Sequence, residues 1–320
     1  MKSPFPYSDS NKRYYTYDYF LRKKFGKKVF KVTLDAGFTC PNIDGSKGVG
    51  GCTYCSSRGS GDFAASPSLS IKEQHSIVRA VMDKKWEGGL CIPYFQAHTN
   101  TYAPLCVLKE NFEQALELPD AVGLDIATRA DCLSDETVEY LRELHERTFL
   151  TVELGLQTIH DITAEKINRC HTYEEFLRGY ERLKGLNVCV HIINGLPGET
   201  HEMMLETAKE LARIRPFMVK IHLLHIIEGT KMAQQYLAHE FELPTLEEYV
   251  ATVCDQLEIL PEDTVIARVT GDGAPDTLIA PLWSKKKLVV MNEIDKELYR
   301  RNSMQGDKYL LKNELYAKNN

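Results

Sequence analysis

The sequence predicts an α/β fold, a partial (β/α)6 barrel of the TIM type with a C-terminal appendage. Short apolar runs rich in β-branched residues alternate with longer amphipathic stretches, which is typical of βα units around a parallel sheet. The alternation occurs six times, too few for the eight units of a closed barrel. Polar motifs follow the ends of the apolar runs, at the edge where such folds place their active sites.

The expected elements follow one another without internal repeats. We expect strands over residues 29–34, 90–96, 121–127, 149–154, 188–193 and 219–224. We expect helices over residues 70–85, 109–116, 134–147, 172–186 and 199–214. Thr172 is followed three residues later by Glu175, a capping-box pattern that marks a helix start. A helix near 246–260, a strand over 264–269 and a helical tail form the appendage.

Three parts of the chain are expected. Residues 1–29 form a basic and aromatic extension, residues 30–236 the partial barrel, and residues 237–320 an appendage on the same domain. Eight lysines and arginines lie between residues 12 and 31, where Asp18 is the only acid, and tyrosines are interleaved with them. Such a cluster either follows the phosphates of a nucleic acid or is a solvated charged face, and charge alone does not decide between these.

Composition excludes several classes of protein. The 320 residues are 43% apolar with a net charge of −6, which fits a folded globular protein rather than a disordered one. No run approaches the roughly 18 apolar residues of a membrane span, and the N-terminus lacks the apolar core of a signal peptide. We therefore expect a cytoplasmic protein without membrane contact. Its nine cysteines, an odd number at irregular spacing, argue against a disulfide framework.

Three of these cysteines lie in CPNIDGSKGVGGCTYCSS, residues 40–57, directly after the first expected strand. A structural zinc site needs four ligands, and a redox C-x-x-C pair leaves Cys40 and the glycine-rich loop unexplained. An iron–sulfur cluster held by Cys40, Cys52 and Cys55 leaves one iron open for another ligand. The position at a strand end favours this third interpretation, because a catalytic metal site requires an open coordination position.

An ordered series of motifs resembles the radical S-adenosylmethionine (radical SAM) superfamily, and specifically its Elongator-like branch. Cys40-Pro41 and the Cys52-Thr53-Tyr54-Cys55 run resemble the cluster motif of that branch. The segments TRAD (128–131), ELGLQT (153–158), INRCH (167–171) and GLPGE (195–199) are similar to later motifs in the same order. The resemblance covers roughly residues 30–270. It implies a [4Fe-4S] cluster on the three cysteines that cleaves S-adenosylmethionine (SAM) to a 5′-deoxyadenosyl radical.

The resemblance also implies which residues contact SAM. Arg169 would pair with the carboxylate of SAM, Glu153 and Gln157 would reach its ribose and sulfonium, and Gly195 would allow close approach of the adenine. The full implied set is Gln96, Thr128, Arg129, Glu153, Gln157, Arg169, Ile193, Gly195 and Leu223. A surface ion pair, a buried polar network and plain core packing are the alternatives for these positions. No residue is assigned to the chemistry on the substrate.

Three positions depart from the pattern of the branch. Ala130 replaces its usual proline, and Cys170 replaces its usual glycine, either as inert packing or as a second functional thiol. Residues 96–102, QAHTNTY, replace the turn that usually meets the amine of SAM. Five histidines near strand ends are expected to be structural, and the segment 268–287 is either a lid or a packed loop.

The resemblance implies tRNA as the substrate, modified at C5 of the wobble uridine or on a side chain at C5. Because no acetyltransferase domain of the Elongator type is visible, a partner modification enzyme is a further expectation. An electron donor such as flavodoxin or ferredoxin is also expected. Two alternatives remain: a radical SAM enzyme that acts on a small metabolite, and a non-catalytic iron–sulfur protein that senses redox state.

Overall fold

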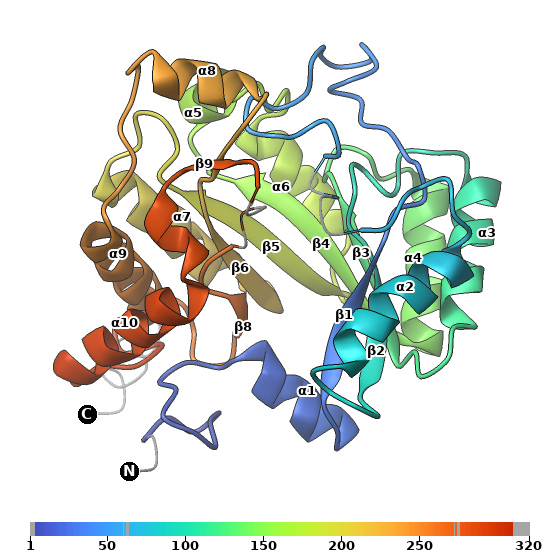
Figure 1. Cartoon of the computed structure of the whole chain (residues 1–320), viewed down its shortest axis with the longest axis horizontal. Helices are drawn as coiled ribbons and strands as arrows, with labels where there is room; N and C mark the ends of the chain where they lie inside the picture. The colour runs from blue at the N-terminus through green and yellow to red at the C-terminus, as the bar shows by residue number, and fades with distance from the viewer. Residues whose placement is uncertain (1–3, 60, 62–63, 272, 274–275, 310–320) are drawn as a thin grey trace. The chain divides into compact units, whose positions relative to one another are not determined.

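The computed structural model describes residues 4–59, 61, 64–271, 273 and 276–309 (Figure 1). The chain divides into two compact units. The cysteine unit comprises Leu21–Leu156 and Ala164–Val190, and the C-terminal unit comprises Met1–Phe20, Gln157–Thr163 and His191–Asn320.

The cysteine unit is built from parallel strands and the helices that follow them. Lys31 pairs with Ile92 across the first two strands, and Ala127 pairs with Glu153 across the third and fourth. The helix after the first strand packs on that strand. Its N-cap Ser70 forms a capping box with Glu73. The strands are β1 (Val29–Leu34), β2 (Leu90–Phe95), β3 (Gly123–Thr128) and β4 (Phe149–Gln157), and the helices are α2 (Ile71–Asp83), α3 (Leu105–Leu116), α4 (Asp135–Arg147) and α6 (Tyr173–Arg182). Helices α1 (Tyr17–Phe25) and α5 (Asp161–Lys166) and the last residue of β4 are divided between this unit and the other.

The C-terminal unit continues the same pattern. Strand β5 (Asn187–Asn194) belongs to both units, and β6 (Met218–Leu223) pairs in parallel with β8 (Val265–Arg268). The short strands β7 (Ile226–Ile227) and β9 (Leu278–Ala280) form a separate antiparallel pair. Helices α7 and α10 both pack on α9. The helices are α7 (His201–Ile214), α8 (Lys231–Leu237), α9 (Leu246–Ile259), α10 (Lys287–Arg300) and the 3₁₀ turn η1 (Leu282–Lys285).

The strand order of the sheet is β1-β2-β3-β4-β5-β6-β8. Neighbours in the sheet are therefore neighbours along the chain, as in barrels, whereas doubly wound sheets reverse their order at a switch point. The expected α/β partial barrel is confirmed. The sheet has one strand more than predicted, because β8 from the expected appendage pairs with β6.

Two helices begin or end at residues other than those predicted, because the local backbone conformation sets these boundaries. Helix α3 begins at Leu105, four residues earlier than predicted, after the N-cap Pro104. Helix α6 ends at Arg182 instead of residue 186, shortly before Gly185, whose φ of +93° ends helical geometry. None of the helices in the described ranges has the length and apolar character that crossing a membrane requires.

The N-terminal aromatic residues are partly used in packing. Tyr14 and Tyr17 are buried, so neither is available to stack on a base. Tyr15 stacks on Tyr7 with ring centroids 4.6 Å apart, and its carbonyl accepts the amide N–H of Ile266 on β8. The N-terminal segment therefore covers the edge of β8, which would otherwise expose unpaired backbone groups.

Candidate functional site

The loop between Cys40 and Cys52 is folded back on itself by backbone hydrogen bonds. The amide of Gly51 donates to the carbonyl of Asn42 over 2.8 Å, and the amide of Lys47 donates to Pro41 over 2.9 Å. Gly48 has no room for a side chain, since a Cβ there would lie 2.2 Å from Asn42 Oδ1. The hydrogen bonds within the loop therefore bring back together Cys40 and Cys52, which eleven residues separate in the sequence.

The three predicted ligand cysteines are all free thiols, and Cys52 is the most enclosed of them. The amide of Cys55 donates to the carbonyl of Cys52 over 3.0 Å. A hydrogen bond between the two side chains is the main cause that lowers the pKa of Cys52, and the guanidiniums of Arg169 and Arg129 lower it further. The same hydrogen bond raises the pKa of Cys55. The site therefore stabilises one thiolate before any ligand binds.

A turn after α5 holds Arg169 against this loop. The side chain of Asn168 donates to the carbonyl of Gly51 over 2.7 Å, and Thr53 donates its amide to Ile167 over 3.0 Å. Arg169 Nη2 donates to the carbonyl of Gly155 over 2.5 Å, and Nη1 lies 3.9 Å from Cys52 Sγ. The guanidinium is buried, and its Nε has no hydrogen-bond partner in the described part of the chain.

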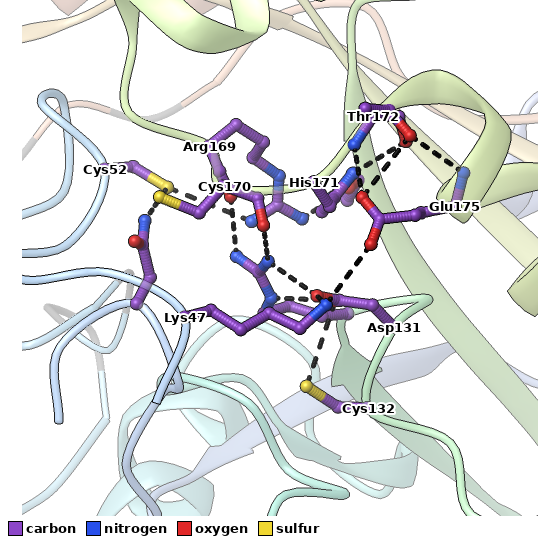
Figure 2. Close-up of polar contacts among 12 residues, drawn as sticks. Lys47, Cys52, Asp131, Cys132, Arg169, Cys170, His171, Thr172 and Glu175 are labelled. Carbon is purple, nitrogen blue, oxygen red and sulfur yellow. Dashed lines mark hydrogen bonds and ion pairs between the residues drawn. The ribbon is translucent and has the colours of Figure 1, made fainter. Parts of the chain in front are cut away.

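A second buried guanidinium, that of Arg129, ties the end of β3 to the same turn. Its Nε and Nη2 each lie 2.9 Å from an oxygen of Asp131, and its Nη1 donates to the carbonyl of Arg169 over 3.0 Å. Lys47 from the cysteine loop lies 2.8 Å from Asp131 and 3.5 Å from Glu175 (Figure 2). Burial alone would raise the pKa of Asp131, but its hydrogen bonds to Arg129 and Lys47 hold that pKa well below its usual range. The cysteine loop and the end of β3 thus meet on the Asp131 carboxylate, and Arg129 links them to the turn after α5.

His171 follows the same turn and is kept neutral. Its Nδ1 lies 3.2 Å from the carbonyl of Thr172, so Nδ1 carries the proton and donates. Burial, followed by the charges of Arg169 and Arg129, lowers the pKa of His171 to about 3. Its Nε2 is a buried acceptor for which the described residues supply no donor.

Several polar atoms around the thiols are therefore buried without a partner among the described residues. They are Asn42 Oδ1, Thr53 Oγ1, Arg169 Nε and His171 Nε2. Buried polar atoms are rarely left unbonded in native proteins, so unpartnered ones indicate a place for a ligand. Three soft thiol ligands beside two buried guanidiniums fit an anionic metal–sulfur group.

The other predicted residues of the cysteine unit lie on its strands or directly after one of them. Thr128 Oγ1 is 2.5 Å from Thr101 Oγ1, and both are buried. Glu153 is buried on β4 and accepts a hydrogen bond from Lys31 over 2.6 Å, while Lys31 also pairs with the buried Asp125. Gln96 begins the turn after β2, where its amide donates to Leu34 over 3.3 Å.

The remaining predicted residues belong to the C-terminal unit. Gln157 has a φ of +72°. Ile193 and Leu223 are buried at the ends of β5 and β6. Gly195 has a φ of +85°, and a Cβ there would lie 2.9 Å from Pro244 Cδ, so backbone geometry and space both require glycine.

Some functional candidates were not found from the sequence. Asn42, Lys47 and Asp131 lie inside quoted motifs, but their contacts come from other segments and leave no local pattern. Lys31 and Asp125 did leave a signal, since each is a charged residue in the middle of an apolar strand. In the segment 268–287, β9 pairs with β7, and Trp283 packs 5.6 Å from Tyr249, which favours a packed loop for its described part. Residues 272, 274 and 275 of that segment lie outside the described residues.

Two protein-family models together match most of the chain. The model of the radical SAM superfamily matches residues 46–211, and that of the radical SAM C-terminal domain matches residues 216–300.

Relatives and solved structures agree with these models. The uncharacterized protein YtqA of Bacillus subtilis (strain 168) is 51% identical over 306 residues, 95% of each chain. The tRNA uridine(34) acetyltransferase of Methanocaldococcus jannaschii is 31% identical over 172 residues, which are 52% of this chain and 31% of that protein. The structure of Elp3 from Methanocaldococcus infernus, with residues 1–46 deleted, superposes with a TM-score of 0.63 at 20% identity, over 87% of this chain and 64% of that one. At this identity the superposition shows a shared fold.

Proposed function

Because this chain belongs to the radical SAM superfamily, we propose that Cys40, Cys52 and Cys55 hold its cluster and that its substrate is a tRNA. Like its family, the chain is an enzyme that uses a [4Fe-4S] cluster and SAM. The proposed reaction modifies C5 of the wobble uridine, or a side chain already present at C5.

The observation that carries the cluster assignment is the cysteine loop packed against two buried guanidiniums. A cluster with three thiolate ligands is anionic, and Arg129 and Arg169 offset that charge in a buried place. The bound cluster supplies the electron that cleaves SAM to methionine and a 5′-deoxyadenosyl radical. Two nitrogens of Arg169 already contact Gly155 and Cys52. Arg169 therefore binds the carboxylate of SAM through its Nε and not through two nitrogens at once.

The remaining SAM contacts are proposed from the motifs. Glu153 and Gln157 contact the ribose and sulfonium, and Gly195 the adenine, beside Ile193 and Leu223. Thr128 and Gln96 lie at the ends of β3 and β2, the edge at which a bound SAM would be expected.

A basic surface on the cysteine unit supports an RNA substrate. It combines two segments, since Lys28 Nζ lies 4.7 Å from the ring centre of Trp86. Trp86 is 37% exposed, which leaves part of its ring open to solvent. Lysines with an exposed aromatic ring suit phosphate contact and base stacking. We call this the lysine surface, and its members are Lys23, Lys24, Lys27, Lys28, Lys84, Lys85 and Trp86.

The lysine surface and the cysteine loop lie at opposite ends of β1. Lys28 precedes this six-residue strand and Cys40 follows it, so about 20 Å separate the two ends. We therefore assign the lysine surface to the body of the tRNA and not to the nucleotide that reacts. The name of the relative from Methanocaldococcus jannaschii supplies the proposed nucleotide, uridine 34.

Three accompanying proposals follow from the same assignment. A low-potential donor such as flavodoxin or ferredoxin reduces the cluster. The protein acts in the cytoplasm, where tRNA is modified. A partner enzyme installs or completes the side chain on which this protein acts.

The cluster assignment is tested by iron and sulfide analysis after anaerobic reconstitution. Replacing Cys40, Cys52 or Cys55 by alanine is expected to abolish the four-iron content, whereas Cys106→Ala, at an exposed cysteine, is expected to retain it. Full iron content in any of the three variants would refute the assignment.

The substrate assignment is tested by comparing the nucleosides of total tRNA from cells with and without the gene. We expect one wobble-uridine nucleoside to disappear and its precursor to accumulate, and both changes to be reversed by the intact gene but not by a Cys52→Ala copy. An unchanged profile would refute tRNA and favour a small metabolite.

A further inference from the structure

We propose that Asn42 and Arg169 set the reduction potential of the cluster by donating N–H groups to the sulfur of Cys52. The inference rests on the proposed role of Cys52 as a cluster ligand. It gives Asn42, which no motif singles out, a function of its own.

Asn42 is fixed with its amide against Cys52. Its side chain is fully buried, and Nδ2 lies 3.5 Å from Cys52 Sγ. Nδ2 also donates to the carbonyl of Asn168, and the backbone carbonyl of Asn42 accepts from Gly51. The space that the amide occupies exists because residue 48 is glycine. Asn42 therefore approaches the sulfur from a rigid position.

Arg169 is the second donor to the same sulfur. Its Nη1 lies 3.9 Å from Cys52 Sγ, and the bond from Nη2 to Gly155 holds the plane of the guanidinium. Because 3.9 Å is long for a hydrogen bond, the positive charge of the guanidinium also contributes to stabilising negative charge on the sulfur. Within the described ranges, Cys40 and Cys55 receive no side-chain N–H donor, so the three proposed ligands are not equivalent.

Reduction of the cluster adds one electron and makes its sulfur ligands more negative. An N–H group directed at a ligand sulfur stabilises the reduced state more than the oxidised state, so it raises the reduction potential. Removal of such a donor makes the cluster harder to reduce. Because the donors meet at Cys52, the iron bound there is the one that they favour as the site of the added electron.

The test measures the midpoint potential of the reconstituted holoenzyme without SAM, by dithionite titration followed by electron paramagnetic resonance. Asn42→Leu has a similar volume and no N–H group. We expect its potential to be more negative than that of the wild type by about 59 mV or more, a tenfold smaller equilibrium constant for one-electron reduction. Arg169→Lys keeps the charge but loses the fixed donor, and we expect a smaller shift in the same direction.

Asn111→Leu is the matched control, because it makes the same replacement at an asparagine of α3 whose side-chain amide donates to the carbonyl of Val107 and not to a cysteine. Its potential is expected to equal that of the wild type. A shift of less than about 18 mV for Asn42→Leu, a factor of two in that equilibrium constant, would overturn the inference while leaving the cluster assignment intact. If Asn42→Leu binds no iron, Arg169→Lys decides, and an unshifted potential there overturns the inference. A wild-type protein that binds no cluster refutes the proposed function itself.

Discussion

Cys170 stands where the family motif usually has glycine, and its backbone angle φ accounts for that glycine. Its φ is +55°, in the left-handed region that costs a residue with a Cβ about 1–2 kcal/mol. Glycine adopts this region freely, which accounts for the glycine usual at this place in the branch that the sequence resembles. The Cys170 thiol lies 3.4 Å from Asn168 Oδ1, and within the described residues it forms no hydrogen bond with the three ligand cysteines.

Cys170→Gly is therefore expected to be tolerated. Relief of the left-handed strain offsets the greater entropy of glycine in the unfolded chain, so the free energy of unfolding should change by less than about 1 kcal/mol. Iron content after reconstitution should equal that of the wild type. A loss of iron together with unchanged stability would show that Cys170 is a functional thiol.

His171 gives the folded protein a defined response to acid. Its pKa is about 3 when folded, against the ordinary value of 6.5, so between these values the unfolded chain binds the proton that the folded chain excludes. Stability contributed by neutral His171 is therefore complete above about pH 6.5 and is lost as the pH falls toward 3, at up to about 1.4 kcal/mol per pH unit.

His171→Gln should flatten this dependence. The measurement is the free energy of unfolding of the cluster-free protein by urea between pH 6.5 and 4.5, where the variant should lose less stability than the wild type. His239→Gln, at an exposed histidine, serves as the control. If the free energy of unfolding falls equally steeply with decreasing pH in the wild type and in His171→Gln, the conclusion that the buried imidazole of His171 is neutral is wrong.

At the scale of elements, Asp131 joins the cysteine loop, the end of β3 and the turn before α6. Its carboxylate pairs with Lys47 (Figure 2) and with Arg129, and Arg129 in turn binds the carbonyl of Arg169. Removing one partner of a buried ion pair leaves the other charges uncompensated, which costs about 3–5 kcal/mol.

Asp131→Asn is accordingly expected to destabilise the protein by about 3 kcal/mol or more and to lower its iron content. Asp135→Asn is the control, because Asp135 forms an exposed ion pair with Arg182 that contributes at most about 1 kcal/mol. Chemical denaturation compares the two variants with the wild type. Equal losses of stability for both variants would refute the bridging role of Asp131.

The order of the elements could be predicted because apolar runs and helix caps are local signals. The capping box at Thr172, and the sequence spacing of the three cysteines, are read directly from neighbouring residues. Helix α1 and the β7–β9 pair were missed because they are short. Asn42, Lys47 and Asp131 were missed because their roles depend on contacts between segments that are distant in the sequence.

At the scale of the whole molecule, the net charge of the chain is negative, whereas the lysine surface is positively charged. The chain carries −6 overall, so RNA binding depends on the lysine surface rather than on a general attraction. Each lysine that contacts a phosphate releases counterions, which makes the affinity for RNA fall as salt is added.

Lys27→Gln together with Lys28→Gln is expected to weaken tRNA binding and to reduce the slope of log K against log salt by about two. Formation of 5′-deoxyadenosine without tRNA should not change, because β1 separates these lysines from the cysteine loop. Lys184→Gln, at an exposed lysine of the same unit, is the control. Unaltered tRNA affinity in the double variant would exclude the lysine surface as the RNA contact.

The central claim is that the three-cysteine loop holds the cluster that cleaves SAM. The most direct measurement quantifies 5′-deoxyadenosine made by the reconstituted, dithionite-reduced protein with SAM. Wild type and Cys106→Ala should form it at equal rates, and Cys40→Ala, Cys52→Ala and Cys55→Ala should form none above the protein-free background. Formation of 5′-deoxyadenosine by any of these three variants at the wild-type rate would contradict the account.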